Sequence, residues 1–267
     1  MNAVSQRSTS ATFVEDYAAA ARRLAEAIGH TDLRLPVTAC PGWTAYDVVV
    51  HLGNVHSWAA TIVETGRSTP EAEDRPRSSR PRQVAEWYAG KAEDLLLVLR
   101  EAVPDRPCWN FVRGTGPNRF WQRRQLHETL VHLHDLDRAA GRLTAVDPAV
   151  AADGVDEVLE VMLPRVHAKG HATALERPLL LTATDTGDSW QLRPGDGPPE
   201  VSRPGRPRGG AHTREDGRTD HAEDALEASA AGLYRLLWHR AGTDDVGARV
   251  SGCADRVETF LRSPLVP

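Results

Sequence analysis

The sequence has few cysteines and no long apolar run, and both absences narrow the class of protein. Its 267 residues include three cysteines, which lie far apart and have no C-x-x-C partner. This pattern argues against a disulfide framework and favours a reducing compartment. No stretch approaches the ~18 apolar residues of a membrane-spanning helix, and the first residues lack the layout of a signal peptide. We therefore expect a cytoplasmic protein with no membrane partner.

The sequence also lacks an excess of basic charge. Lysine and arginine total 32 against 37 acidic residues, which gives a formal net charge of −5. Proteins that bind nucleic acid are usually basic and carry a basic stripe, so we do not expect a nucleic-acid partner. No exposed heptad seam indicates a coiled-coil dimer. The apolar content suits a monomer or a weak dimer.

What the chain does contain is a series of helical patterns in its first part. Apolar residues recur at helical spacing in five segments, at residues 13–28, 44–66, 83–103, 118–140 and 147–164. Thr44 and Asp47 have the spacing of a capping box at the start of the second segment. Asp147 and Pro148 are typical of a helix start, with a capping acid before a first-turn proline. The sequence therefore predicts a helical domain.

The pattern changes after residue 175. The segment PLLLTATDTGDSWQLRP alternates around a turn at residues 185–188, which predicts a hairpin. Two later segments, DALEASAAGLYRLLWHRAG and VSGCADRVETFLRSP, each predict a strand followed by a helix. Residues 202–220 are rich in Gly, Arg and Pro and predict a mobile loop. The predicted fold class is α+β, with a helical domain at residues 1–168 and a small α+β domain at residues 175–267.

The segment HETLVHLHD, which begins at residue 127, carries the main candidate site. Glu128 and His132 are four residues apart, so on a helix their side chains stack over adjacent turns and can meet one metal ion. Asp135 follows on the same face, either as a third ligand or as an acid that orients His132. His127 and His134 share another face, roughly 10 Å apart along the axis, which is too far to chelate one ion easily. We expect these two histidines to be structural.

A catalytic divalent metal needs at least three protein ligands, and the second predicted helix offers two histidines. His51 and His56 are about 140° apart on a helix, so they cannot both face one site. Each shares its stripe with apolar residues, and a histidine in such a setting is more often a core residue than a ligand. The periodicity leaves the choice between them open.

The chain resembles the maleylpyruvate isomerase family of mycothiol-dependent enzymes in three segments, CPGWTAYDVVVHLGNVHSWAATIVETG, FWQRRQLHETLVHLHDLDRAAG and LYRLLWHR. This resemblance implies a DinB-like four-helix bundle followed by a small domain similar to sterol-carrier proteins. It also implies a divalent metal, usually taken as zinc, held by His51, Glu128 and His132. Asp135 matches an acid that follows the second histidine in the family. Arg240 matches an arginine implicated in the family's catalysis.

The expected function follows from this metal site. A metal-bound thiol is deprotonated, which supplies a nucleophile at neutral pH. We expect mycothiol to act as this co-substrate on an electrophilic small molecule, as an S-transferase or an isomerase, with Asp135 and Arg240 as catalytic residues. The alternatives are maleylpyruvate cis–trans isomerisation proper and a non-catalytic metal-binding or sensor protein.

Tryptophan is the remaining feature that the sequence singles out. We expect three tryptophans to fill the core of the bundle rather than to contact a ligand, namely Trp43, Trp58 and Trp121.

Overall fold

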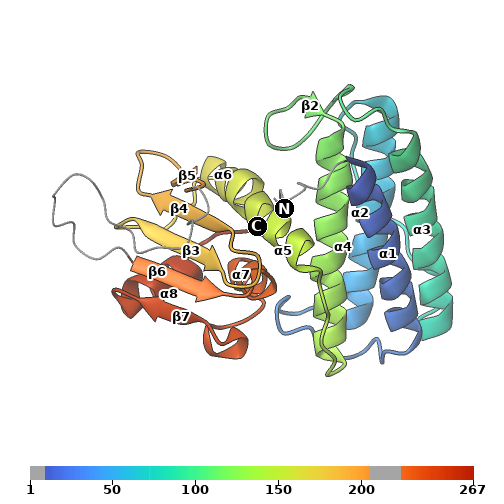
Figure 1. The fold of residues 1–267 in the computed structure, drawn as a ribbon. Helices are drawn as coiled ribbons and strands as arrows, with labels where there is room; N and C mark the ends of the chain where they lie inside the picture. Colours follow the sequence, from blue (N-terminus) through green and yellow to red (C-terminus); the bar gives the residue numbers. More distant parts are fainter. Residues whose placement is uncertain (1–9, 72, 205–223) are drawn as a thin grey trace, which may run out of the picture. The chain divides into compact units, whose positions relative to one another are not determined.

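The chain forms two compact units, Met1–Ala145 and Val146–Pro267. The computed structural model describes residues 10–71, 73–204 and 224–267 (Figure 1). Four long helices form the first unit, and a five-stranded sheet with helices forms the second, which confirms the α+β class. Most of the loop predicted at residues 202–220 lies outside the described residues.

The first unit is a four-helix bundle. Its helices are α1 (Ser10–Gly29), α2 (Ala45–Thr65), α3 (Pro81–Glu101) and α4 (Arg119–Ala139). Helices α1 and α2 each pack against both α3 and α4, so α1 and α2 occupy opposite corners of the bundle. Two short strands, β1 (Pro107–Cys108) and β2 (Gly116–Pro117), form a small hairpin before α4. The predicted bundle is therefore confirmed, with boundaries within a few residues of those expected.

The capping box predicted at the start of α2 is confirmed. The backbone N–H of Thr44 donates to the Asp47 carboxylate over 2.9 Å, and the Thr44 hydroxyl accepts from the backbone N–H of Asp47. At the other end, Gly66 adopts a left-handed φ of 70° and its N–H donates to the carbonyl of Ile62. These contacts fix where α2 begins and where it ends.

Helix α4 is unusual because it buries polar side chains as well as apolar ones. Its buried polar residues are Gln122, Arg124, Gln125, His127, Thr129, His132, His134, Asp135 and Asp137. Buried polar groups are costly unless they have partners. A helix that turns so many of them inward therefore indicates a site built inside the bundle.

The second unit contains a five-stranded sheet in the order β5-β4-β3-β6-β7. The strands are β3 (Leu179–Ala183), β4 (Ser189–Arg193), β5 (Glu200–Ser202), β6 (Asp224–Ala228) and β7 (Arg249–Ser251). Strands β3 and β4 form the predicted hairpin, and the pairing of β3 with β6 is parallel. The two predicted strand-to-helix segments are also confirmed, since β6 leads into α7 (Ala230–Leu237) and β7 into α8 (Ala254–Arg262). A short 3-10 turn, η2 (Asp244–Val246), lies between α7 and β7.

The fifth predicted helix belongs to the second unit and not to the bundle. It runs through α5 (Pro148–Glu157), a π-helical turn η1 (Val158–Met162) and α6 (Leu163–Ala168). Helix α5 packs against α7, where Gly154 faces the ring of Tyr234. The indole N–H of Trp190 donates to Asp156 over 2.7 Å. The division therefore lies at residues 145–146 and not at 168–175 as expected, because the helical pattern does not reveal which neighbour the apolar face will pack against.

None of the helices in the described part of the chain has the length and apolar character needed to cross a membrane.

Candidate metal centre

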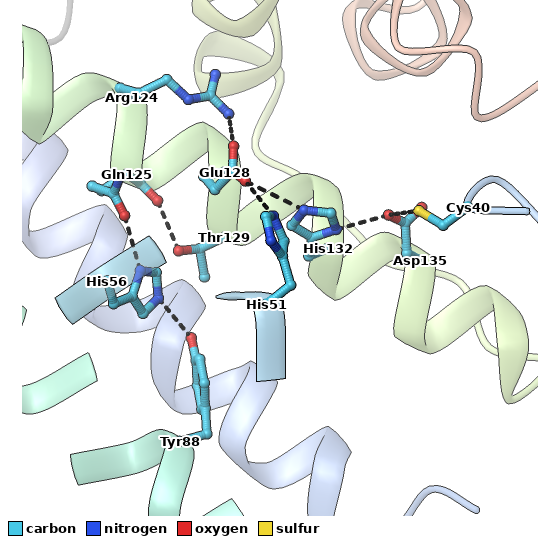
Figure 2. A network of polar contacts seen from close by, with 10 residues as sticks. All are labelled: Cys40, His51, His56, Tyr88, Arg124, Gln125, Glu128, Thr129, His132 and Asp135. Carbon is cyan, nitrogen blue, oxygen red and sulfur yellow. Dashed lines mark hydrogen bonds and ion pairs between the residues drawn. The ribbon is translucent and has the colours of Figure 1, made fainter. Parts of the chain in front are cut away.

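Three of the predicted site residues lie together in the bundle. His51 comes from α2, and Glu128 and His132 come from α4; Figure 2 shows them pointing toward one another. Nε2 of His51 is 3.5 Å from Oε1 of Glu128, and Nε2 of His132 is 3.3 Å from the same oxygen. One ligand atom from each residue lies within 4.8 Å of the others. Two imidazoles and one carboxylate are the donor set of many catalytic zinc sites, so these residues fit a divalent cation.

The second histidine of α2 lies elsewhere. His56 is completely buried, with Nδ1 2.9 Å from Oε1 of Gln125 and Nε2 3.2 Å from the hydroxyl of Tyr88. The ring of Tyr17 meets it edge-on at 5.4 Å between centroids. Burial lowers the pKa of His56 to about 4, although its hydrogen bond to Gln125 acts in the opposite direction. His56 is therefore a neutral core histidine, and of the two histidines of α2 it is His51 that lies beside Glu128 and His132.

The cluster is closed on one side and open on the other. The side chain of His132 is 10% exposed and that of Glu128 18%, whereas the side chain of His51 is 34% exposed. The apolar residues on the same stripe of the helix suggested that His51 points into the interior. In the structure it lies instead at the edge of the bundle. A catalytic metal site keeps a coordination position free for water or substrate, and this open side suits that requirement.

Charged neighbours hold Glu128 in its ionised form. Its burial alone would raise the pKa of the carboxyl group, but Arg124 and the hydrogen bonds to His132 and His51 hold that pKa well below its usual range. The guanidinium of Arg124 is itself buried and donates to Oε2 of Glu128. The other oxygen, Oε1, faces the two histidines, so the carboxylate presents one oxygen to the site.

Asp135 orients His132 in the structure. Its Oδ2 lies 3.0 Å from Nδ1 of His132, so the Nδ1–H donates to the carboxylate and Nε2 is left on the side of Glu128. Burial alone would lower the pKa of His132, but the hydrogen bonds to Asp135 and Glu128 and their charges raise it to about 9. Such carboxylate–histidine pairs are a common outer support of metal ligands. Of the two roles open to Asp135, the geometry therefore fits the orienting acid.

Two residues near the cluster were not recognised from the sequence. The thiol of Cys40 lies 3.9 Å from Oδ2 of Asp135. Trp43 is 38% exposed, and its ring meets that of His51 at 5.2 Å between centroids. The prediction that Trp43 fills the core is therefore wrong, whereas Trp121 is fully buried and Trp58 packs edge-on against it. No local sequence pattern predicts the contact of Cys40 with Asp135 or that of Trp43 with His51, because both depend on how the loop after α1 is folded.

The remaining predicted residues lie outside the cluster. His127 and His134 are both buried on α4 and neither belongs to the group of potential ligands. Arg240 lies in the second unit, just after α7, where its guanidinium donates to the carbonyl of Trp238 over 2.9 Å and lies 5.9 Å from the centre of that indole. Its catalytic role stays a prediction.

Comparison with known proteins shows that the bundle is similar to a known domain family. Residues 14–137 match the family model of the mycothiol maleylpyruvate isomerase N-terminal domain. The resemblance to this isomerase family is confirmed. The match contains His51, Glu128 and His132, so the whole cluster lies within the region shared with the family.

The fold of most of the chain is also similar to that of solved structures. A solved structure of the mycothiol-dependent maleylpyruvate isomerase matches with a TM-score of 0.61 and 14% sequence identity, covering 92% of this chain and 95% of that one. A histidine-to-alanine mutant of that isomerase matches over the same shares with a TM-score of 0.62 and 13% identity. At this identity the likeness shows the fold alone. No curated protein matches the chain.

Proposed function

We propose that this protein is a metal-dependent enzyme that uses the low-molecular-weight thiol mycothiol as a nucleophile on an electrophilic small molecule. The observation that carries the proposal is the half-open group of His51, Glu128 and His132 in one region of the bundle. That region matches a domain family whose description names mycothiol. Two observations thus support a thiol co-substrate: the open side of the three-residue group, and the match to a family model that names mycothiol.

The donor set favours Zn²⁺ as the metal. Two imidazole nitrogens and one carboxylate oxygen form a ligand combination found in catalytic zinc sites. When bound there, a divalent cation would lower the pKa of a thiol that reaches the open side, so that thiolate is available at neutral pH. Asp135 keeps Nε2 of His132 directed at the site, and Arg124 keeps one oxygen of Glu128 directed at it.

The reaction begins when the thiol loses its proton and its sulfur forms a bond to the electrophilic carbon. The electron pair of the attacked double bond moves onto the acceptor group of the substrate. If the neighbouring carbon of the former double bond then takes up a proton, the thioether is the product and the net reaction is S-transfer. If rotation about the former double bond is followed by cleavage of the S–C bond, the thiol is returned and the net reaction is isomerisation.

The more specific alternative is cis–trans isomerisation of maleylpyruvate. It is favoured by the two similar structures, which are both described as mycothiol-dependent maleylpyruvate isomerases. Incubation with mycothiol and maleylpyruvate separates the two outcomes, because isomerisation leaves the thiol concentration unchanged and S-transfer consumes it. A protein that binds metal and thiol but changes neither substrate would instead be the non-catalytic binding or sensor protein.

The metal site is tested by the metal content of purified variants. Wild-type protein should contain about one zinc ion per chain, and His51→Ala and His132→Ala should each lose it, because two ligands hold a zinc ion poorly. His30→Gln, which replaces an exposed histidine outside the cluster, is the control and should keep the metal. Retention of zinc by both alanine variants would remove the basis of the proposal. Arg240→Ala should keep the metal and lose activity if that residue has its predicted role.

The thiol is tested separately on metal-loaded protein. A ligand that binds the folded state raises the melting temperature by mass action. Mycothiol at millimolar concentration should do so, and the shift should disappear in His132→Ala. A shift with a different low-molecular-weight thiol and none with mycothiol would reassign the co-substrate.

We also propose that the protein acts in the cytoplasm. Cys40, Cys108 and Cys253 form no disulfide bond, and a reaction that depends on a reduced thiol suits a reducing compartment.

A further inference from the structure

We propose that the tight turn at residues 40–43, in the loop between α1 and α2, supports both histidine ligands and thereby sets the affinity and geometry of the metal site. The inference rests on the proposed function, since it assigns positioning residues to the proposed metal centre. It concerns Cys40 and Trp43, the two residues at the ends of the turn.

The sequence Cys-Pro-Gly-Trp gives this turn a defined shape. The N–H of Trp43 donates to the carbonyl of Cys40 over 3.0 Å, and Gly42 has a φ of 84°. Proline at the second position and a left-handed glycine at the third are typical of a type II turn. The turn is also fastened to Val37, whose carbonyl accepts from Cys40 and whose N–H donates to the carbonyl of Trp43 over 2.9 Å. The two end residues are therefore held at a fixed separation.

Each end of the turn reaches a different ligand. The thiol of Cys40 lies 3.9 Å from Oδ2 of Asp135, and that oxygen lies 3.0 Å from Nδ1 of His132 (Figure 2). The ring of Trp43 meets the ring of His51 at 5.2 Å with an interplanar angle of 63°. The rings of the two histidines are 5.4 Å apart and nearly perpendicular. A single turn thus contacts the surroundings of a ligand on α2 and of a ligand on α4.

The contact with Trp43 matters because His51 has less support than His132. A metal-binding histidine usually donates its second ring N–H to a fixed acceptor, which orients the ring. His132 has such an acceptor in Asp135. Among the described residues, no hydrogen bond to Nδ1 of His51 is formed, and the side chain is one-third exposed. The edge of Trp43 is therefore the restraint that takes the place of a hydrogen bond.

This role also accounts for the position of Trp43. A large indole that is 38% exposed gains less from burial than the fully buried indole of Trp121. Its place beside His51 gives it a use outside the core, which the contacts of the turn make specific.

The sharpest test changes the turn without removing either contacting side chain. Gly42→Ala puts a Cβ on a residue with φ of 84°, where the side chain has open space but the backbone is strained. Gly114→Ala is the matched control, since Gly114 has φ of 74° and equally open surroundings in another loop. The readouts are the zinc dissociation constant, from competition with a chelator, and the visible absorption spectrum of the Co²⁺-substituted protein, which reports the ligand geometry.

We expect Gly42→Ala to weaken zinc binding about tenfold, at the lower end of what loss of an outer support causes, and to alter the Co²⁺ spectrum. Trp43→Ala should do the same, and Trp43→Phe should restore most of the affinity because it keeps an aromatic edge beside His51. Gly114→Ala should bind as wild type. Circular dichroism checks that each variant is folded. If Trp43→Ala does not fold, the result for Gly42→Ala alone tests whether the turn supports the ligands.

The outcomes separate this inference from the proposed function. If wild-type protein binds zinc and His132→Ala loses it, but Gly42→Ala and Trp43→Ala both bind as tightly as wild type with an unchanged Co²⁺ spectrum, the turn does not support the ligands and the metal site stands. If Gly42→Ala and Gly114→Ala weaken binding equally, the effect is general strain and the inference also fails. If wild-type protein binds no metal at these residues, the proposed function and the inference fall together.

Discussion

Acidification should destabilise this protein through His56, which is buried in its neutral form. The pKa of His56 is lowered by burial from 6.5 to about 4. The imidazole of His56 therefore becomes protonated below about pH 6.5 in the unfolded chain, but only below about pH 4 in the folded bundle. The stability that His56 contributes is complete above its unfolded pKa and is lost progressively as the pH falls from 6.5 toward 4.

The magnitude follows from the size of this shift. One pKa unit corresponds to about 1.4 kcal/mol, and an unfolded chain that binds one more proton than the folded one loses about that much stability per pH unit. Between pH 7 and pH 5 the unfolded imidazole becomes protonated and the folded one does not. The free energy of unfolding should therefore fall by about 2 kcal/mol over this range through His56 alone.

The hydrogen bonds of His56 also favour its neutral form, so they too predict a loss of stability at low pH. With Gln125 presenting its carbonyl oxygen, Nδ1 carries the proton and Nε2 accepts from the hydroxyl of Tyr88. Protonation of Nε2 would place two donors against each other until the hydroxyl rotates. Burial raises the pKa of Tyr88 and of Tyr17 above their usual value, so neither phenol ionises in this pH range. The titration in this part of the core therefore belongs to the imidazole.

The assay compares the pH dependence of chemical unfolding in wild type and His56→Gln. The substitution removes the titrating group and keeps a polar side chain, so the difference between the two curves isolates His56. The wild type should lose about 2 kcal/mol more than His56→Gln between pH 7 and pH 5. His30→Gln is the control variant, since it also replaces an imidazole by an amide but at an exposed position just after α1.

NMR titration of the imidazole gives a direct check. The ring resonances of His56 should remain those of a neutral imidazole down to about pH 5. A midpoint near 6.5, or parallel stability curves for wild type and His56→Gln, would refute the reasoning, because either result would mean that the folded core accepts the proton as easily as water does.

Two further predictions concern the packing and capping of helices. Gly154→Ala would place a Cβ 2.5 Å from the nearest ring carbon of the buried Tyr234. It should lower the free energy of unfolding by about 1–3 kcal/mol in chemical denaturation. Gly90→Ala, on α3 with open space around it, should instead raise the free energy of unfolding by up to about 1 kcal/mol. Thr44→Ala removes the hydroxyl that accepts from the N–H of Asp47 and should cost about 1 kcal/mol in the same assay. An undiminished stability of Gly154→Ala or of Thr44→Ala would contradict the corresponding contact.

The part of the site that lies on one helix could be predicted from the sequence. Glu128 and His132 are one turn apart, and helical geometry alone brings their side chains to one place. The same geometry separated His127 and His134 from them. These predictions depended only on the period of the helix, which the apolar pattern and the ends of α4 made clear.

The part of the site that joins different elements could not be predicted in this way. Asp135 and Cys40 are 95 residues apart in the chain, and the spacing within α4 says nothing about what the loop after α1 brings to it. Trp43 was expected in the core because a large indole is usually buried, yet its ring ends at the edge of the bundle beside His51. The prediction of the boundary between the two units was wrong for a related reason, because an apolar helical face does not specify which element it packs against.

The two histidines of α2 show how the core and the site depend on each other. His56 fixes one face of α2 through hydrogen bonds to Gln125 on α4 and to Tyr88 on α3. His51 lies five residues earlier, about 140° around the helix axis, so the rotation that buries His56 between α3 and α4 also directs His51 to Glu128. One histidine therefore cannot be exchanged for the other by a small adjustment of the helix. The polar contacts of His56 act on the site by setting the rotation of α2, even though His56 contributes no ligand atom to it.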